Sequence, residues 1–244
     1  MSDCKHVHIS IAVLAILILA ATPAAAQVPV VDTHYAGATS AKSVAIADTV
    51  LGIAVAFDVN GEDFLWVVGN QPQHIGSGAF ELSIGKEELV GWDGAQLRVY
   101  DLNQQAWTVR VDASGPASQW ESLTYFPVRD WIEAHEPVGT VVGQFLGGAP
   151  VEANVRGYEK RVVYDFVNPQ NGTSDVGVYD FGSGPVVQFV SQREERRPDI
   201  DGDTVAYESS WHDGILTYDL GTGASQVVPV PPTCTRGERP VVGG

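Results

Sequence analysis

Three aspartates occupy alternate positions of the segment PDIDGDTVAYES, residues 198–209, and could do metal chemistry. Carboxylates spaced around a glycine can supply oxygen ligands to calcium, which takes about six to eight of them. The segment departs from the calcium-loop pattern D-x-[DN]-x-[DN]-G with its later glutamate. A hairpin turn at Gly202, leading into the strand TVAYES, needs only the conformational freedom of glycine. We therefore predict a turn and keep a calcium site at Asp199, Asp201 and Asp203 as the alternative.

The segment DVNGED, residues 58–63, poses the same choice between a metal loop and a turn. It contains Asn60-Gly61, a dipeptide typical of two-residue hairpin turns, between two apolar stretches. We predict a hairpin turn here as well.

Other patterns of catalytic or metal chemistry are missing from the sequence. No histidine pair has the H-x-x-x-H spacing of a metal site, and no G-x-S-x-G segment marks a serine nucleophile. The Asp-box pattern S-x-D-x-G-x-x-W is also absent. With so many acidic residues, pairs of carboxylates would come close by chance, so a glycosidase pair cannot be assigned. The sequence predicts no catalytic residue, no metal ligand and no cofactor.

The N-terminal 26 residues have the pattern of a secretory signal peptide. The apolar run IAVLAILILAA, residues 11–21, follows a weakly basic start and ends in a small-residue cleavage pattern at Ala24 and Ala26. The run is shorter than the roughly 20 residues of a spanning helix, although an uncleaved membrane anchor is the alternative. We expect an exported chain, periplasmic or extracellular, that starts near Gln27 and inserts no further into a membrane.

The net charge and the cysteine count narrow the class of partner. The formal charge is −16, so the surface would repel the phosphates of nucleic acids and of anionic membranes. Cys4 lies in the predicted signal peptide and Cys234 stands alone in the remainder. A lone cysteine in an exported protein is a free thiol, an intermolecular link, or half of a pair with a missing partner.

The chain contains internal repeats. The pattern Tyr-Asp-apolar occurs in VYDL (99–102), VYDF (178–181) and TYDL (217–220), and a weaker copy, AFDV (56–59), precedes them. The first interval between these tyrosines is about twice the second, which implies one degraded copy between them. Short strand-like segments with turns between them, at a period near 40, are typical of the four-stranded blades of a β-propeller. The only short helix that we predict is DWIEAHE, residues 130–136.

The segment RRPDIDGDTVAYESSWHDGILTYDLGTG resembles the repeat of the TolB-like, WD-like β-propeller family. Residues 196–228 match that pattern well, 151–190 match with an insertion, and 80–109 match loosely. The match is poor for 27–79 and poorer for 116–150, so the resemblance covers roughly half of residues 27–244. Together with the repeats it implies an all-β propeller of four-stranded blades over residues 27–244. It implies little about function, because propellers carry many unrelated roles.

The aligned repeats bear on the turn at Gly202 and on the end of the chain. The segments that align with DIDGD each contain glycine but not the aspartates, which favours a turn over a metal site. The last six residues, RPVVGG (239–244), align on RPDIDG (197–202). We therefore expect either about five blades closed by a strand from 239–244, or a fragment of a larger propeller. Trp92 aligns with Tyr164 and Tyr207 and is predicted to pack between blades.

The loops of the last repeat supply the candidate binding residues. The loop SSWHDG (209–214) joins the second and third strands of its blade, and the run SQREERR (191–197) connects two blades. In propellers these two kinds of loop share one face. A solvated rim is the alternative to a binding face at this place. The candidate ligand-binding residues are Trp211, His212, Arg193, Arg196 and Arg197.

The sequence as a whole predicts an exported propeller that acts as a binding module. The expected partner is an envelope or extracellular protein, or a glycan, held on loops that a rigid scaffold presents. The alternatives are a polysaccharide hydrolase or lyase, the accessory propeller of a larger peptidase, and a truncated product without independent function. An enzyme would show a cluster of acids with perturbed pKa values, whereas a binding module would show an aromatic and basic patch without one.

Overall fold

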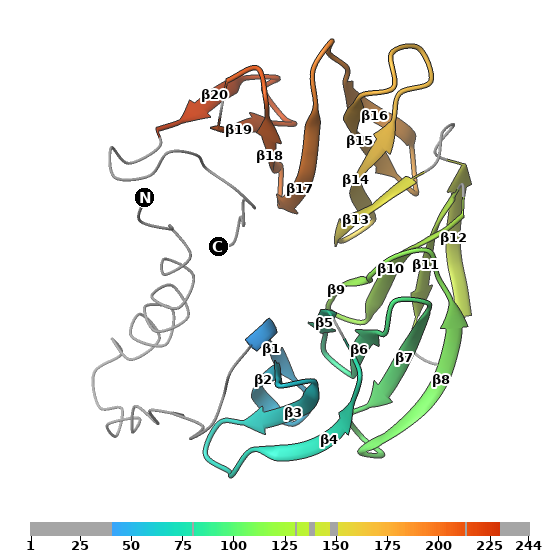
Figure 1. The fold of residues 1–244 in the computed structure, drawn as a ribbon, viewed down its shortest axis with the longest axis vertical. Coiled ribbons are helices and arrows are strands. Elements are labelled where there is room, and N and C mark those ends of the chain that lie inside the picture. Colours follow the sequence, from blue (N-terminus) through green and yellow to red (C-terminus); the bar gives the residue numbers. More distant parts are fainter. Residues whose placement is uncertain are drawn as a thin grey trace. The chain divides into compact units, whose positions relative to one another are not determined.

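The computed structural model describes residues 41–79, 81–129, 131–136, 140–146, 151–212 and 214–229. These residues form strands and turns, arranged as five four-stranded antiparallel sheets in one compact unit, residues 39–244 (Figure 1). Among them, no helix is long and apolar enough to cross a membrane. The predicted signal peptide, Cys234 and the segment 239–244 lie outside the described residues.

Four consecutive strands make each sheet, and each strand pairs with the next one along the chain. Sheet 1 contains β1 (Ala41–Thr49), β2 (Gly52–Val59), β3 (Glu62–Val67) and β4 (Gln73–Ser77). Sheet 2 contains β5 (Glu81–Ile84), β6 (Glu88–Trp92), β7 (Gln96–Asp101) and β8 (Ala106–Asp112). Sheet 3 contains β9 (Ser118–Trp120), β10 (Leu123–Val128), β11 (Trp131–Glu136) and β12 (Thr140–Leu146). Sheet 4 contains β13 (Val151–Tyr158), β14 (Arg161–Val167), β15 (Ser174–Asp180) and β16 (Gly184–Phe189). Sheet 5 contains β17 (Glu195–Asp201), β18 (Thr204–Ser209), β19 (Gly214–Asp219) and β20 (Ser225–Val228).

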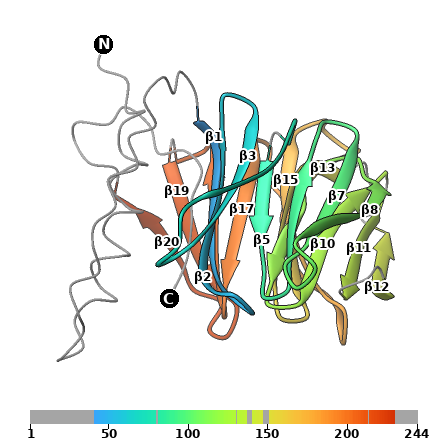
Figure 2. The ribbon, with the colours of Figure 1, turned by 90° about the horizontal axis from the view of Figure 1, so that it is seen from below.

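The sheets follow one another in chain order, with the first strand of each beside the first strand of the next (Figure 1). Turned by 90°, the first strands β1, β5 and β17 stand roughly upright, whereas the last strand of sheet 5, β20, is inclined to them (Figure 2). This radial stack of four-stranded antiparallel sheets is a β-propeller of about five blades. The fold class predicted from the repeats is confirmed, including sheets 1 and 3, where the repeat pattern is weakest.

Apolar layers between neighbouring sheets hold the blades together. Sheets 1 and 2 enclose a layer around Leu65 and Leu89, and sheets 2 and 3 enclose one around Val90 and Phe126. Sheets 3 and 4 share Tyr125, Ile132, Val162 and Tyr164, while sheets 4 and 5 share Val163, Val178, Ile200 and Tyr207. The second strands of sheets 2, 4 and 5 bury side chains on both faces, and each contains a short apolar run, LVGW, VVY and VAY respectively.

Sheet 1 buries only one of its faces. Ala54, Ala56 and Leu65 are at most 2 % exposed and point toward sheet 2. On the opposite face, Val44 and Ile46 are 60 % and 50 % exposed. A sheet with one apolar face left open has room for a further packing partner.

The recurring Tyr-Asp pair ends the third strand of its sheet, and both of its residues stabilise the blade. Tyr100 is buried between sheets 1 and 2. The following aspartate caps the turn: Asp101 Oδ1 accepts the main-chain N–H groups of Asn103 and Gln104 at 2.8 and 2.9 Å. Asp180 and Asp219 cap the corresponding turns of sheets 4 and 5 in the same way. Such Asx turns explain why the pattern recurs at this position.

The degraded copy implied by the spacing lies at His135-Glu136. In sheet 3, Thr124 pairs with His135, as Leu89 pairs with Tyr100 in sheet 2, so His135 takes the place of the tyrosine. The helix predicted for residues 130–136 is wrong, because residues 131–136 form strand β11. Ile132 and Ala134 are buried at alternate positions, and β11 pairs with strands on both sides. A single turn of helix could not bury both side chains or replace these two ladders.

Two alignments made from the sequence are shifted in the structure. AFDV lies in β2, a second strand, whereas the Tyr-Asp pairs end third strands. Trp92 is four residues beyond Glu88, which pairs with Asp101, while Tyr164 is three residues beyond Arg161, which pairs with Asp180. Trp92 is therefore one residue out of register with Tyr164 and lies on the other face of its sheet. It still packs between blades, with sheet 3, as predicted.

The glycines of the aligned turns serve two different purposes. Gly202 has φ +58° in the β17–β18 turn, and Asn60 and Gly61 have φ 57° and 84° in the β2–β3 turn, so both predicted hairpins are confirmed. Gly157, however, lies inside β13, where a Cβ would overlap the ring of Tyr125 in sheet 3. The turn after β13 is made by Glu159, with φ 53°. At this position glycine is needed because two blades approach closely, and not because of a turn.

Candidate functional site

Trp211 and Arg193 form an exposed pair at one end of sheet 5. Trp211 lies in the β18–β19 loop and is 61 % exposed. The Arg193 guanidinium carbon is 5.1 Å from the centre of its ring, and Arg193 Nη1 donates to the Ser210 carbonyl at 3.4 Å. A cation over an indole face is favourable and leaves the other ring face available.

The two loops that carry this pair are fastened to each other. Ser210 N–H donates to the Glu194 carbonyl at 2.9 Å, and Glu194 N–H donates to Ser210 Oγ at 3.0 Å. Ser191 Oγ accepts from Arg193 N–H and donates to the Arg193 carbonyl, both at 2.9 Å. The predicted meeting of the inter-blade connection and the β18–β19 loop is confirmed. His212 is exposed in the same loop, and its main-chain N–H donates to Ser209 at 3.3 Å.

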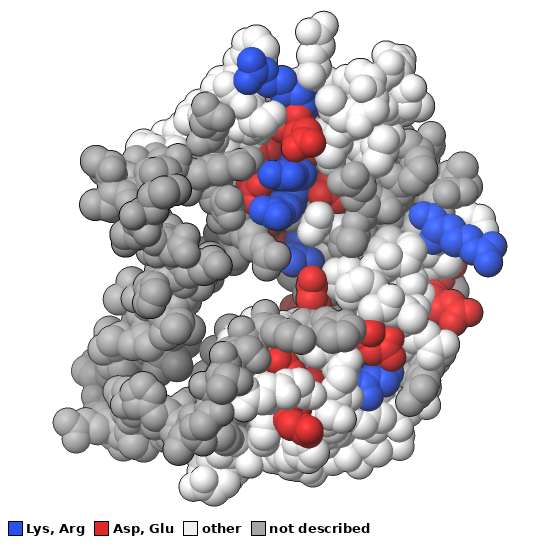
Figure 3. All heavy atoms as spheres, in the orientation of Figure 1, with Lys and Arg blue, Asp and Glu red and all other residues white. Residues whose placement is uncertain are grey.

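Arg196 and Arg197 belong to strand β17 and not to the connection in which the sequence placed them. Arg197 has φ 51°, and the pairing of β17 with β18 shifts between Arg196 and Asp199, as in a β-bulge. Both guanidinium groups bind Glu208, which is 3 % exposed, at 3.3 and 3.0 Å. These two arginines neutralise a buried carboxylate, so they are less available to a ligand than Arg193. Figure 3 shows basic and acidic side chains alternating over sheet 5 and its neighbour.

A buried carboxyl group that the sequence analysis did not single out lies beneath these loops. Glu195 is 8 % exposed, and its Oε2 atom has no hydrogen-bond partner within the described part of the chain. Burial raises the pKa of Glu195 from 4.5 to about 7, Ser191 opposes this, and the nearby Asp175 adds to it. Asp175 is itself fully buried and accepts from Asn168 Nδ2 at 2.6 Å. The strand alternation within the run REER could have indicated that Glu195 points inward.

The three aspartates around Gly202 do not converge into a metal cluster. Asp203 forms an ion pair with Arg161 of sheet 4, and Arg161 Nη1 also donates to the Gly202 carbonyl at 3.3 Å. Asp199 and Asp201 lie within β17. Among the residues that the structure describes, no three His, Cys, Asp or Glu side chains gather as they would around a metal ion.

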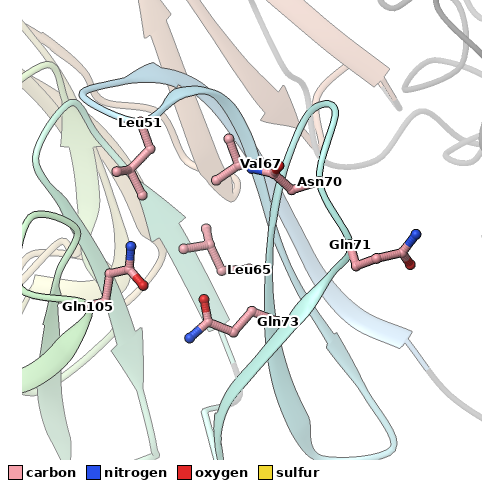
Figure 4. A pocket seen from close by; sticks show the side chains of 7 residues that line it. All are labelled: Leu51, Leu65, Val67, Asn70, Gln71, Gln73 and Gln105. Atoms are coloured by element: carbon pink, nitrogen blue, oxygen red, sulfur yellow. The ribbon is translucent and has the colours of Figure 1, made fainter.

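A pocket with a volume of about 350 Å³ is lined by residues of sheet 1 and by Gln105 of the β7–β8 turn (Figure 4). Leu51, Leu65, Gln73 and Gln105 point into the same space, while Gln71 points away. No charged or titratable group is among its lining residues. The pocket could hold a small neutral molecule but offers no group for acid, base or nucleophilic chemistry.

Comparisons with known proteins support the fold and leave the function open. No family model matches this chain, and no curated protein matches it. Solved structures do: hydrazine synthase of Kuenenia stuttgartiensis has a TM-score of 0.57 at 11% identity, and this chain covers 69% of it with 82% of its own length. BamB of Moraxella catarrhalis has a TM-score of 0.51 at 12% identity, with 76% of this chain covering 60% of that one. The WD40 domain of Neurospora crassa Pan2 has a TM-score of 0.52 at 15% identity, with 73% of this chain covering 63%.

These similarities concern the propeller fold alone. This chain covers less than two thirds of the length of BamB and of the Pan2 domain. One of the three, hydrazine synthase, is named as an enzyme. A shared fold at this level of identity carries no function with it.

Proposed function

We propose that this chain is a propeller-type binding module whose partner is a protein held on the loop face of sheet 5. The observation that carries the proposal is the Trp211–Arg193 pair, an exposed aromatic side chain with a guanidinium group over one face of its ring. Tryptophan and arginine are the side chains that contribute most often to binding hot spots. His212 completes the exposed part of this surface.

The attachment of the loops supports this proposal. Five hydrogen bonds between residues 191–194 and Ser210 or within the connection, including that from Arg193 Nη1 to the Ser210 carbonyl, fix Arg193 over the ring before any partner arrives. Preorganised side chains lose less entropy on binding than mobile ones. Arg196 and Arg197 stabilise this face of sheet 5, because they bind Glu208 and so keep β17 and β18 together.

The location of the protein and the class of its partner are proposed from the sequence. We propose an exported protein, periplasmic or extracellular, whose partner is an envelope or extracellular protein. The signal-peptide pattern of residues 1–26 and the formal charge of −16 support this location. A glycan is the second candidate partner, favoured by the open face of Trp211, on which a sugar ring can stack.

The experiment that tests the proposal compares co-purification from the native host. The tagged full chain is used as the wild type, as Trp211→Ala, and as Val186→Ala, whose side chain is exposed on sheet 4 as a matched control. Mass spectrometry should identify a protein that the wild type and Val186→Ala retain and that Trp211→Ala loses. A partner retained equally by all three variants would refute the loop face. Loss of polysaccharide binding in Trp211→Ala, without a protein partner, would favour the glycan.

A further inference from the structure

The β2–β3 hairpin places two aspartates directly opposite each other in the core. Asp58 and Asp63 are cross-strand partners, two residues from the Asn60-Gly61 turn. Both are 0 % exposed and continue the inward-facing rows of Ala56 and Leu65. Like charges directly opposite each other in a sheet are unfavourable, and burial increases that cost.

Among the described residues, three of the four carboxylate oxygens of this pair have no hydrogen-bond donor. These are Oδ1 and Oδ2 of Asp58 and Oδ1 of Asp63. The remaining oxygen, Asp63 Oδ2, accepts from Ala79 N–H at 3.4 Å and from Arg98 Nη2 at 3.2 Å. Arg98 also donates to the Ser77 carbonyl at 2.8 Å and lies over the Trp107 ring. The Arg98 guanidinium thus binds Asp63, and Asp58 has no hydrogen-bond partner among the described residues.

The hairpin is fixed in this arrangement by its own main chain. Asn60 and Gly61 both have positive φ angles, and Gly78 N–H donates to the Gly61 carbonyl at 3.0 Å. The turn therefore keeps Asp58 and Asp63 directly opposite each other, with both side chains buried. A fully buried carboxylate without a donor requires either a cation or a proton.

We propose that Asp58 and Asp63 bind a hard cation of the calcium type, with both oxygens of Asp58 and Oδ1 of Asp63 as protein ligands. Hard cations prefer carboxylate oxygens, and water or main-chain carbonyls commonly complete their coordination. Arg98 forms an ion pair with Asp63 and offsets one of the two negative charges, so a cation would offset the other. The strongly acidic chain also raises the local concentration of cations.

This site is separate from the aspartates around Gly202. Asp203 already has the Arg161 guanidinium as its partner, so its carboxylate has less need of a cation than Asp58. A substitution at Asp203 therefore provides a control in which one acidic side chain is removed outside the proposed site.

The test measures thermal unfolding of the full chain in EDTA and at increasing calcium concentrations. For an ion that binds only the folded state, each tenfold increase above the dissociation constant should raise Tm by about 3 to 6 °C. Asp58→Asn should abolish this rise and should fold at least as well as the wild type in EDTA, because it removes the repulsion between the two carboxylates. Asp203→Asn should keep the rise. Terbium emission sensitised by aromatic side chains should be lost in Asp58→Asn and retained in Asp203→Asn.

Three outcomes would overturn the proposal. Calcium that leaves Tm of the wild type unchanged would exclude a calcium site at this pair. A calcium response abolished by Asp203→Asn but not by Asp58→Asn would place the ion at the β17–β18 turn. A response that survives both substitutions would place it elsewhere in the chain.

Discussion

Replacing Glu195 by glutamine should make the protein more stable at pH 8 and leave its stability nearly unchanged at pH 4.5. Burial raises the pKa of Glu195 from 4.5 to about 7 in the folded state. One pKa unit corresponds to about 1.4 kcal/mol, so ionising this carboxyl within the fold costs on the order of 3 kcal/mol. Glutamine resembles the protonated carboxyl in shape and never ionises.

The direction with pH follows from proton linkage. Between pH 4.5 and 7, unfolded Glu195 loses its proton while the folded protein keeps it, so the contribution of this group to stability falls as the pH rises. That contribution is fully present below pH 4.5 and is lost once the pH exceeds about 7. The stability difference between Glu195→Gln and the wild type should therefore grow from near zero at pH 4.5 to about 2 to 3 kcal/mol at pH 8.

Urea denaturation at pH 4.5, 6, 7 and 8 measures this difference, with each variant compared with the wild type at the same pH. Glu194→Gln is the matched control, because the neighbouring Glu194 side chain is 53% exposed and forms only a surface ion pair with Arg196. Its stability difference should stay within about 0.5 kcal/mol at every pH. A difference for Glu195→Gln that is the same at pH 4.5 and pH 8 would refute the assignment of a buried, protonated carboxyl.

Three further substitutions test the packing of the blades, each by urea denaturation. Gly157→Ala should cost about 1 to 3 kcal/mol, because the new Cβ would overlap the Tyr125 ring, and a neutral effect would contradict the close approach of sheets 3 and 4. Ile132→Ala should cost about 2 to 5 kcal/mol, since this residue of β11 is 0 % exposed, and a loss below 1 kcal/mol would be inconsistent with its place in the core. Ile46→Lys should change the stability by less than about 0.5 kcal/mol, because the side chain is 50% exposed on the open face of sheet 1. A large loss on Ile46→Lys would show that another part of the protein covers this face.

The structure has one feature expected of a binding module and one expected of an enzyme. The Trp211–Arg193 pair is the aromatic and basic surface expected of a binding module. The raised pKa of Glu195 is the kind of perturbation expected of an enzyme, but desolvation is its largest cause, and Glu195 is buried behind the loops. Structural carboxyl groups in cores show the same perturbation, so the exposed pair guides the proposed function.

The repeats in the sequence were enough to predict the architecture. The period near 40 and the Tyr-Asp pairs predicted four-stranded blades, because an Asx turn after the third strand is a local requirement that each blade repeats. The Asn60-Gly61 and Gly202 turns were predictable for the same reason, since the positive φ angles are encoded within a few residues. The meeting of the Trp211 loop with the preceding connection followed once blades were assumed.

The tertiary structure alone decided which side chains are buried and what they contact. A shift of one residue moves every side chain of a strand to the other face, and this is how Trp92 was misaligned. Residues 131–136 form a strand because they pair with β10 and β12. The burial of Glu195 and of Asp58 opposite Asp63 depends on neighbouring sheets distant in the sequence. Short-range patterns therefore specified turns and strands, whereas the candidate sites depend on contacts between blades that no local pattern encodes.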